Sequence, residues 1–183
     1  MTTVPPVPAR LAHRPTVGGL VVPWISVTHS TGHVLGAVHG KRRDLCLRDI
    51  LCQTCGQELL HRAVLFVRQA DIRAGYTAEP AMHPECAAYS AKACPMLTGA
   101  MPHYRSHPVR IPGGCPDPGC ECEGWITAED AHTRAGAPAD PWEAWWIDPR
   151  TWPAAVDLTG RLLGLALNQH TPIKIRPLEA TCA

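Results

Sequence analysis

Two pairs of side chains in the middle of the sequence have the types and spacing of metal ligands. Cys52 and Cys55 belong to a Cys-x-x-Cys-Gly motif that ends at Gly56, and His83 and Cys86 form a second pair three residues apart. Two thiolates at this spacing can reach one ion, and the glycine permits a tight backbone turn around the sulfur atoms. The second spacing places both side chains on one face of the first turn of a helix. The sequence therefore predicts one metal centre built from two distant segments.

The predicted centre has three thiolates and one imidazole, which close a tetrahedral shell around Zn²⁺ and leave no position for a substrate water. The 27 residues between Cys55 and His83 leave room for a hairpin that brings the two pairs together. The Cys-x-x-Cys-Gly turn at 52–56, which we call the knuckle, is followed by a hairpin and by two ligands at the start of a helix. This order is typical of a treble-clef zinc site. Two alternatives stay open, namely a thioredoxin-like redox pair and four buried residues without a ligand role.

Three further cysteines lie close together in the run Cys115-Pro-Asp-Pro-Gly-Cys120-Glu-Cys122. A turn-prone loop of this composition can bring thiolates to a second ion, although the spacing is not that of a pair of zinc knuckles. The candidates for a fourth ligand are Cys94, His103 and His107. If only three ligands converge, the open position permits metal-dependent catalysis. The alternative is a loop of unliganded, oxidation-prone thiols.

A short basic run, Lys41-Arg42-Arg43, is the candidate contact with nucleic acid, and a solvated loop is the alternative interpretation. Charge is unevenly spread along the chain. Basic residues outnumber acidic ones over 1–110, and acidic residues outnumber basic ones over 111–183. This asymmetry permits contacts with phosphate groups but does not require them.

Sequence patterns predict few elements around these ligands. The turn-forming cluster at 30–32, flanked by apolar and β-branched residues, predicts a β-hairpin over 24–38. Pro84 suits the first position of a helix, and we expect that helix to end at Pro95. The other predicted elements are strands over 59–69, 142–147 and 172–175, and a helix over 153–168 with leucines available for packing.

These elements divide the chain into four segments. They are an extended Pro-rich arm (1–23), a hairpin with the zinc-binding module (24–98), an irregular insertion rich in Cys, Pro and Gly (99–141) and a C-terminal β-α-β segment (142–183). The predicted fold class is α+β. It consists of a treble-clef-like zinc module on which an N-terminal β-hairpin and a C-terminal strand–helix–strand segment pack.

Length and composition restrict the class of protein. The 183 residues suffice to bury a core, and 45% apolar against 18% charged residues excludes a disordered tail or a coiled coil. A net charge of +1 excludes a polybasic protein. The sequence shows no signal segment and no apolar stretch near the roughly 20 residues of a membrane span. We therefore expect a cytoplasmic protein without membrane contact, whose nine cysteines favour metal binding over disulfides.

Three motifs follow one another along the chain. They are Val22-Pro23-Trp24, the Cys-x-x-Cys-Gly motif at Cys52, and His-x-x-Cys-Ala-x-x-Ser-Ala-x-x-Cys-Pro from His83 to Pro95. With these motifs the chain resembles a family of small uncharacterised actinobacterial and actinophage proteins. The similarity covers 20–98 and fails at 111–124. It implies a metal-binding module and a shared role for Cys94-Pro95, and it implies no activity. The metal ligands implied by the resemblance are Cys52, Cys55, His83 and Cys86.

The predicted function is a zinc-stabilised, non-catalytic binding module of bacterial or phage origin that contacts protein or nucleic acid. The alternative is a metal-dependent enzyme with a second site at Cys115, Cys120 or Cys122. A redox or thiol-switch protein is the third hypothesis, ranked last.

Overall fold

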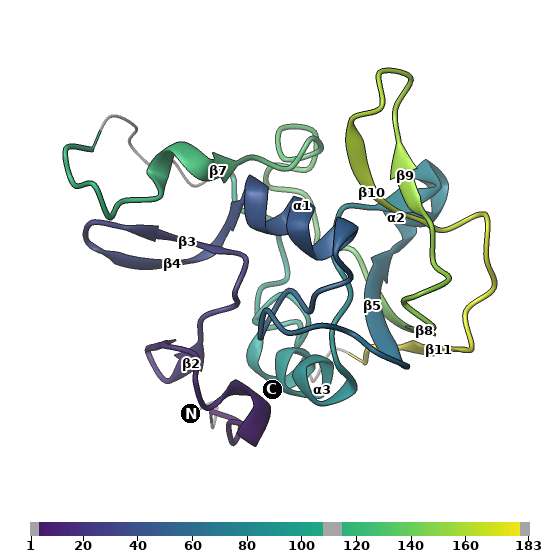
Figure 1. The fold of residues 1–183 in the computed structure, drawn as a ribbon, viewed down its shortest axis with the longest axis horizontal. Coiled ribbons are helices and arrows are strands. Elements are labelled where there is room, and N and C mark those ends of the chain that lie inside the picture. Colours follow the sequence, from purple (N-terminus) through teal and green to yellow (C-terminus); the bar gives the residue numbers. More distant parts are fainter. Residues whose placement is uncertain (1–3, 108–114, 180–183) are drawn as a thin grey trace.

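The structure is a computed structural model that describes residues 4–107 and 115–179. Within these ranges the chain is a mixed α/β arrangement of four small antiparallel sheets and three short α-helices (Figure 1). The β3–β4 hairpin (Ser26–His29 and Gly32–His39) projects on one side, and the β9–β10 hairpin (Ala154–Val156 and Leu162–Ala166) projects on the other.

The main core lies on a three-stranded sheet in the order β11-β8-β5, with bounds Lys174–Pro177, Trp142–Ile147 and Ala63–Arg68. Strand β5 is buried over its first five residues, which suits its continuous apolar run. Its register on β8 runs from Ala63 opposite Ile147 to Arg68 opposite Trp142. The strands predicted over 59–69 and 142–147 are confirmed, the first with a later start. The C-terminal strand lies two residues beyond the predicted 172–175.

Helix α3 (Pro84–Ala93) packs against β5 and carries the second pair of predicted ligands at its start. Pro84 occupies its first turn, and Cys94 is its C-cap, immediately before Pro95. The helix predicted from these two prolines is therefore confirmed. Between Cys55 and His83 the chain does not form the simple hairpin that we expected. Strand β5 pairs mainly with β8, and the chain returns to it through a single bridge between Val64 and Met82.

The hairpin predicted over 24–38 is confirmed as β3 and β4, with a two-residue turn at Ser30 and Thr31. A third strand, β7 (Trp125–Ile126), pairs with the end of β4 and follows the 3₁₀ turn Cys122–Gly124. Apart from an isolated bridge between His103 and Pro138, the rest of the described part of 99–141 is turns, bends and irregular chain, as its Pro and Gly content predicts. This small sheet has its own apolar cluster, which contains Val27, Ala37 and Cys122.

The basic run Lys41-Arg42-Arg43 lies in the first turn of helix α1 (Gly40–Arg48), so its interpretation as a loop is wrong. The helix buries Cys46 and Leu47, and packing of this face stabilises it. Arg48 in its last turn complements the negative end of the helix dipole.

The helix predicted over 153–168 is wrong, because the segment forms the β9–β10 hairpin. The turn is fixed by Asp157, whose carboxylate accepts hydrogen bonds from the backbone N–H groups of Thr159 (2.9 Å) and Arg161 (3.0 Å). Gly160 then adopts a positive φ of 81°. Such a turn is incompatible with a helix. Leu162 and Leu165 of β10 are buried, whereas Leu158 in the turn is exposed. Strand β10 also pairs with β6 (Tyr76–Thr77), which follows helix α2 (Gln69–Ala74).

Residues 4–23, the described part of the segment 1–23, are not the extended arm that the prolines predict. They contain the 3₁₀ turn Ala9–Leu11 and a hairpin of β1 (Thr16–Val17) and β2 (Leu20–Val21). Leu11 is fully buried in the main core, and the backbone N–H of Val21 donates to the Tyr89 hydroxyl of α3 at 2.9 Å. These contacts fold the segment onto the main core and helix α3.

Among the described residues, no helix is both long enough and apolar enough to cross a membrane.

Candidate metal centre

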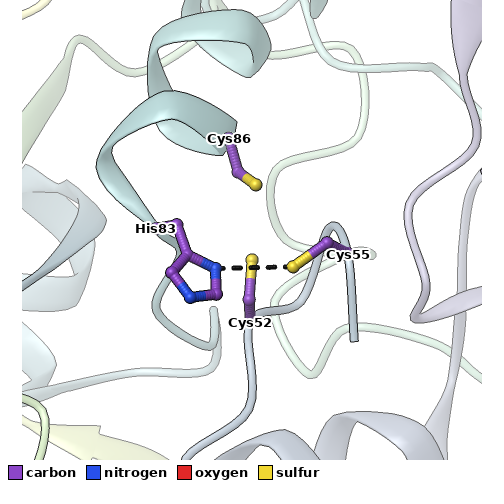
Figure 2. A group of neighbouring side chains, drawn as sticks. All are labelled: Cys52, Cys55, His83 and Cys86. Atoms are coloured by element: carbon purple, nitrogen blue, oxygen red, sulfur yellow. Dashed lines mark hydrogen bonds between the residues drawn. The ribbon is translucent and has the colours of Figure 1, made fainter. Parts of the chain in front are cut away.

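The four side chains selected from their spacing converge at one point. One ligand atom from each of Cys52, Cys55, His83 and Cys86 lies within 4.8 Å of the other three. All four residues are buried, the imidazole at 8% exposure being the most accessible. Figure 2 shows the three sulfur atoms and the imidazole ring pointing toward a common centre. These residues are close enough to hold a metal ion.

The backbone of the first pair forms a tight turn that aims both thiols inward. The N–H of Gly56 donates to the Cys52 carbonyl at 2.8 Å, and the N–H of Cys52 donates to the Gln57 carbonyl at 2.8 Å. Gly56 has a φ of 78°, and a Cβ there would lie 2.7 Å from the Trp24 ring. Glycine is therefore required both for the backbone conformation and for the space. A bridge between Leu51 and Glu58 closes the base of the turn.

His83 is oriented by a hydrogen bond on the side of the ring that faces away from the sulfur atoms. Its Nε2–H donates to the Glu58 carbonyl at 3.0 Å. Its Nδ1 lies 3.4 Å from the Cys55 Sγ. Because Nε2 carries the proton, Nδ1 has a free lone pair directed at the centre. A backbone acceptor that fixes the tautomer of a histidine is a common feature of metal sites.

Cys86 reaches the centre from the first turn of α3, for which His83 is the N-cap. The N–H of Ala87 bonds to the His83 carbonyl at 2.9 Å, so the two ligands are tied to one helical turn. The N-terminus of a helix carries partial positive charge, which favours thiolates at this place.

The N-terminal segment covers the centre, a contribution that sequence reasoning missed. Arg10 forms an ion pair with Glu85 of α3, and its Nη1 donates to the Gln57 side chain at 2.6 Å. The His13 Nε2–H donates to the Cys55 carbonyl at 3.1 Å. Arg10 thus joins the two halves of the centre from outside and places a positive charge beside the thiols. The prolines around these residues gave no signal of this contact.

The charges of the three thiols depend on one another. Hydrogen bonds from Cys55 and Cys86 lower the pKa of Cys52 and favour one thiolate. Hydrogen bonding with Cys52 raises the pKa values of Cys55 and Cys86, and burial acts in the same direction. Hydrogen bonding among the thiols therefore favours the thiolate form at Cys52 over the thiolate forms at Cys55 and Cys86. A divalent cation reverses this preference, because it attracts all three thiolates at once.

Of the three cysteines Cys115, Cys120 and Cys122, which the sequence suggests as a second metal site, the structure brings only the first two together. Cys115 and Cys120 lie together, but the third residue within 4.8 Å is His29 and not Cys122. Cys122 is buried in the small apolar cluster beside β3 and β4, because the 3₁₀ turn that it begins directs the chain into β7. The three suggested fourth ligands, Cys94, His103 and His107, do not belong to this group. Cys94 is instead the C-cap of α3, where burial raises its pKa.

The basic run is largely engaged within the fold. Arg42 forms an ion pair with Glu121, donates to the Trp24 and Ser26 carbonyls, and lies over the Trp24 ring. Arg43 pairs with Asp44 at 2.6 Å and donates to the Leu162 carbonyl of β10 at 3.3 Å. Lys41 is exposed. Two of the three predicted phosphate contacts therefore already stabilise the tertiary structure.

Comparisons of the chain with models of protein families, with curated proteins and with solved structures give no match.

Proposed function

We propose that Cys52, Cys55, His83 and Cys86 bind one Zn²⁺ ion in a closed tetrahedral site and that the protein is a zinc-stabilised, non-catalytic binding module. The observation that carries the proposal is the convergence of four buried soft donors from two distant segments. Thiolate and imidazole are the ligands of structural zinc, and four of them complete its shell. Three thiolates and Zn²⁺ leave a net charge of −1, which Arg10 and the start of α3 offset.

The architecture around this site is treble-clef-like in our proposal. The knuckle at Cys52, the β5 strand with its bridge to Met82, and helix α3 follow in the expected order. Resemblance in the motifs of 20–98 supports assignment to the actinobacterial and actinophage family, and hence a bacterial or phage origin.

A structural role for the metal follows from burial and from the filled shell. A catalytic zinc needs one position for water or substrate, and this centre has four protein donors in a water-poor environment. The free energy of metal binding is then available for folding. An enzyme is the alternative only where a coordination position stays open, as at the half-buried group of His29, Cys115 and Cys120.

A protein partner is favoured over nucleic acid in this proposal. Arg42 and Arg43 are paired with carboxylates, so they are not free to neutralise phosphates. Leu158, at the tip of the β9–β10 hairpin, and Val156 are exposed apolar side chains. Exposed apolar side chains of this kind support a protein partner.

Elemental analysis of wild-type protein and two cysteine variants tests the zinc assignment. We expect Cys86→Ala to contain one zinc per chain fewer than wild type. The matched control is Cys46→Ala, which removes a buried thiol of α1 outside the centre and should leave the zinc content unchanged. Equal zinc in wild type and Cys86→Ala would contradict the proposal.

A salt titration with a double-stranded DNA oligonucleotide tests the partner class. We expect no salt-dependent binding of the oligonucleotide, because Arg42 and Arg43 are already paired with carboxylates within the protein. Tight binding with a steep salt dependence, lost in Lys41→Ala, would show that nucleic acid is the partner.

A further inference from the structure

A second group of soft donors lies far from the first centre in sequence. Atoms of His29, Cys115 and Cys120 lie within 4.8 Å of one another, and all three residues are half-buried. His29 is the last residue of β3, and the two cysteines belong to the loop that precedes the Cys122–Gly124 turn. Two thiolates and an imidazole from separate segments are a donor set for a soft divalent metal.

The two cysteines are brought together by a turn of their own loop. Pro116, Asp117, Pro118 and Gly119 separate them, which gives a Cys-x₄-Cys spacing within the range of zinc ligand pairs. The Asp117 carboxylate accepts the N–H of Gly119 at 2.9 Å, and the Asp117 carbonyl accepts the N–H of Cys120 at 3.0 Å. This turn therefore brings the thiols of Cys115 and Cys120 together, and we call residues 115–120 the cysteine loop.

Hydrogen bonds between the neighbours of His29 and Cys120 place the cysteine loop against His29. The N–H of Glu121 donates to the Thr28 carbonyl at 2.8 Å, and the Glu121 carboxylate accepts the N–H of Thr28 at 2.9 Å. Arg42 holds the same carboxylate in an ion pair. Thr28 precedes His29 and Glu121 follows Cys120, so this pairing brings the imidazole and the thiol to the same position.

The imidazole has hydrogen-bond partners on one nitrogen. The Nδ1 of His29 accepts the backbone N–H of Thr31 at 3.3 Å and lies 3.1 Å from the Thr31 hydroxyl and 3.2 Å from the Ser30 hydroxyl. These contacts hold the ring at the turn of the hairpin. Binding of a metal at Nε2 shifts the proton of the neutral ring to Nδ1, which then donates to one of the two hydroxyls in place of accepting the Thr31 N–H.

The surrounding apolar cluster is small. Its buried members are Val27, Ala37 and Cys122. Cys115 and Cys120 are partly buried and pack against it. A cluster of this size contributes little to holding an irregular loop on a hairpin. A metal bridge between the loop and β3 supplies a stabilising contact at this place.

We propose that His29, Cys115 and Cys120 bind a second Zn²⁺ ion, which fastens the cysteine loop to the β3–β4 hairpin and keeps one coordination position for water or an external donor. Two thiolates neutralise the ion. Partial exposure makes this ion exchangeable, in contrast to the ion in the buried centre. The neighbouring carboxylate of Glu121 is held by Arg42 and by the Thr28 amide, so it does not act as a general base. This site is independent of the proposed function of the first centre.

Zinc stoichiometry of variants tests this site, with protein kept reduced by a phosphine and zinc supplied in excess before desalting. We expect two zinc ions per chain in wild type and one in each of His29→Ala, Cys115→Ser and Cys120→Ser, with an unchanged circular dichroism spectrum. The controls are His33→Ala, on the same hairpin, and Cys122→Ala, a buried thiol of the same loop. Both should keep two ions. One ion in wild type, two ions in the ligand variants, or an equal loss in Cys122→Ala would overturn the proposal.

Alkylation of wild-type protein gives an answer that does not depend on how the variants fold. Peptide mass spectrometry follows the reaction of Cys115 and Cys120 with iodoacetamide after one and after two equivalents of zinc. We expect both thiols to react quickly at one equivalent and at least tenfold more slowly at two. Equal reaction rates of Cys115 and Cys120 at both loadings would overturn the proposal. If the first centre does not bind zinc, Cys52 and Cys86 would react at the same rate with and without zinc, so the two results can be told apart.

Discussion

His83 shows how one residue can join the two halves of the metal centre. Its carbonyl accepts a helical N–H, its Nε2–H donates to Glu58 in the chain that follows the knuckle, and its Nδ1 faces Cys55. Orientation of the ring is therefore fixed before a metal binds. Ligands that are already oriented lose less conformational entropy when the ion arrives.

Gly56 is the residue of the knuckle that a substitution tests most clearly. We expect Gly56→Ala to lower the free energy of unfolding by about 2–4 kcal/mol, because it adds left-handed backbone strain and a contact 2.7 Å from the Trp24 ring. Gly160→Ala is the control, with a similar φ of 81° but nothing within 4 Å of the added Cβ. It should cost only about 1–2 kcal/mol in the same urea titration. Equal losses would show that the Trp24 contact has no effect.

Glu79 gives a prediction about pH. Burial raises the pKa of its carboxyl above the ordinary 4.5, and Asp71 acts in the same direction while Arg68 and Arg134 oppose it. The folded protein therefore binds this proton more tightly than the unfolded chain. The resulting stabilisation is fully present below pH 4.5 and is lost as pH rises through the raised pKa. Glu79→Gln removes this dependence, so the stability of the variant relative to wild type should increase between pH 4.5 and neutral pH. Urea titrations along this range measure the difference, and a constant difference would contradict the prediction.

Spacing made the proximity of the first group of candidate ligands predictable residue by residue. Cys52 with Cys55, and His83 with Cys86, are local pairs whose side chains must lie close together whatever the rest of the chain does. His29 has no such local partner among the cysteines. Its place beside Cys120 depends on hydrogen bonds between Thr28 and Glu121, which are 93 residues apart. No pattern along the sequence indicates a contact of that kind.

At the scale of elements, strands and helices with clear end signals were predicted and the others were not. Pro84 and Pro95 bracket α3, and the β-branched run of β5 has no competing pattern. The leucines over 153–168 also fit one face of a helix, but the turn at Asp157 and Gly160 prevents that helix. Helix α1 has a polar first turn, and its stability comes from packing that the sequence does not display.

The N-terminal segment is an element of the fold and not an appendage, and Leu11 tests this. We expect Leu11→Ala to cost about 2–5 kcal/mol, because a fully buried side chain leaves a cavity in the main core. Val4→Ala, at a residue that is 49% exposed in the same segment, should change stability by less than about 0.5 kcal/mol. Thermal or urea unfolding measures both. A cost for Leu11→Ala as small as for Val4→Ala would show that the segment is dispensable.

At the scale of the whole molecule, the described residues form two apolar clusters, and each cluster adjoins one group of candidate metal ligands. Cys52, Cys55 and Cys86 are part of the main core, whereas Cys115 and Cys120 pack on the small cluster beside β3 and β4. Under the two proposals, loss of metal from Cys52, Cys55, His83 and Cys86 removes support from the main core itself. Loss of metal from the second group affects only how the loop and the hairpin are held together.

Chelation separates these two effects. We expect a weak chelator to remove the exchangeable ion and to raise amide hydrogen exchange only in the cysteine loop and the β3–β4 hairpin. A strong chelator should also remove the buried ion and raise exchange in β5 and α3, since metal binding and folding are coupled there. Protection of β5 and α3 that persists after complete removal of metal would show that the first centre does not stabilise the core.

X-ray absorption at the zinc edge, recorded on the His29→Ala variant, tests the central claim most directly, because in our proposal this variant keeps only the zinc at Cys52, Cys55, His83 and Cys86. We predict a four-coordinate zinc with three sulfur neighbours at about 2.3 Å and one nitrogen at about 2.0–2.1 Å. A first shell dominated by oxygen, or protein that binds no zinc, would contradict the assignment of Cys52, Cys55, His83 and Cys86 as its ligands.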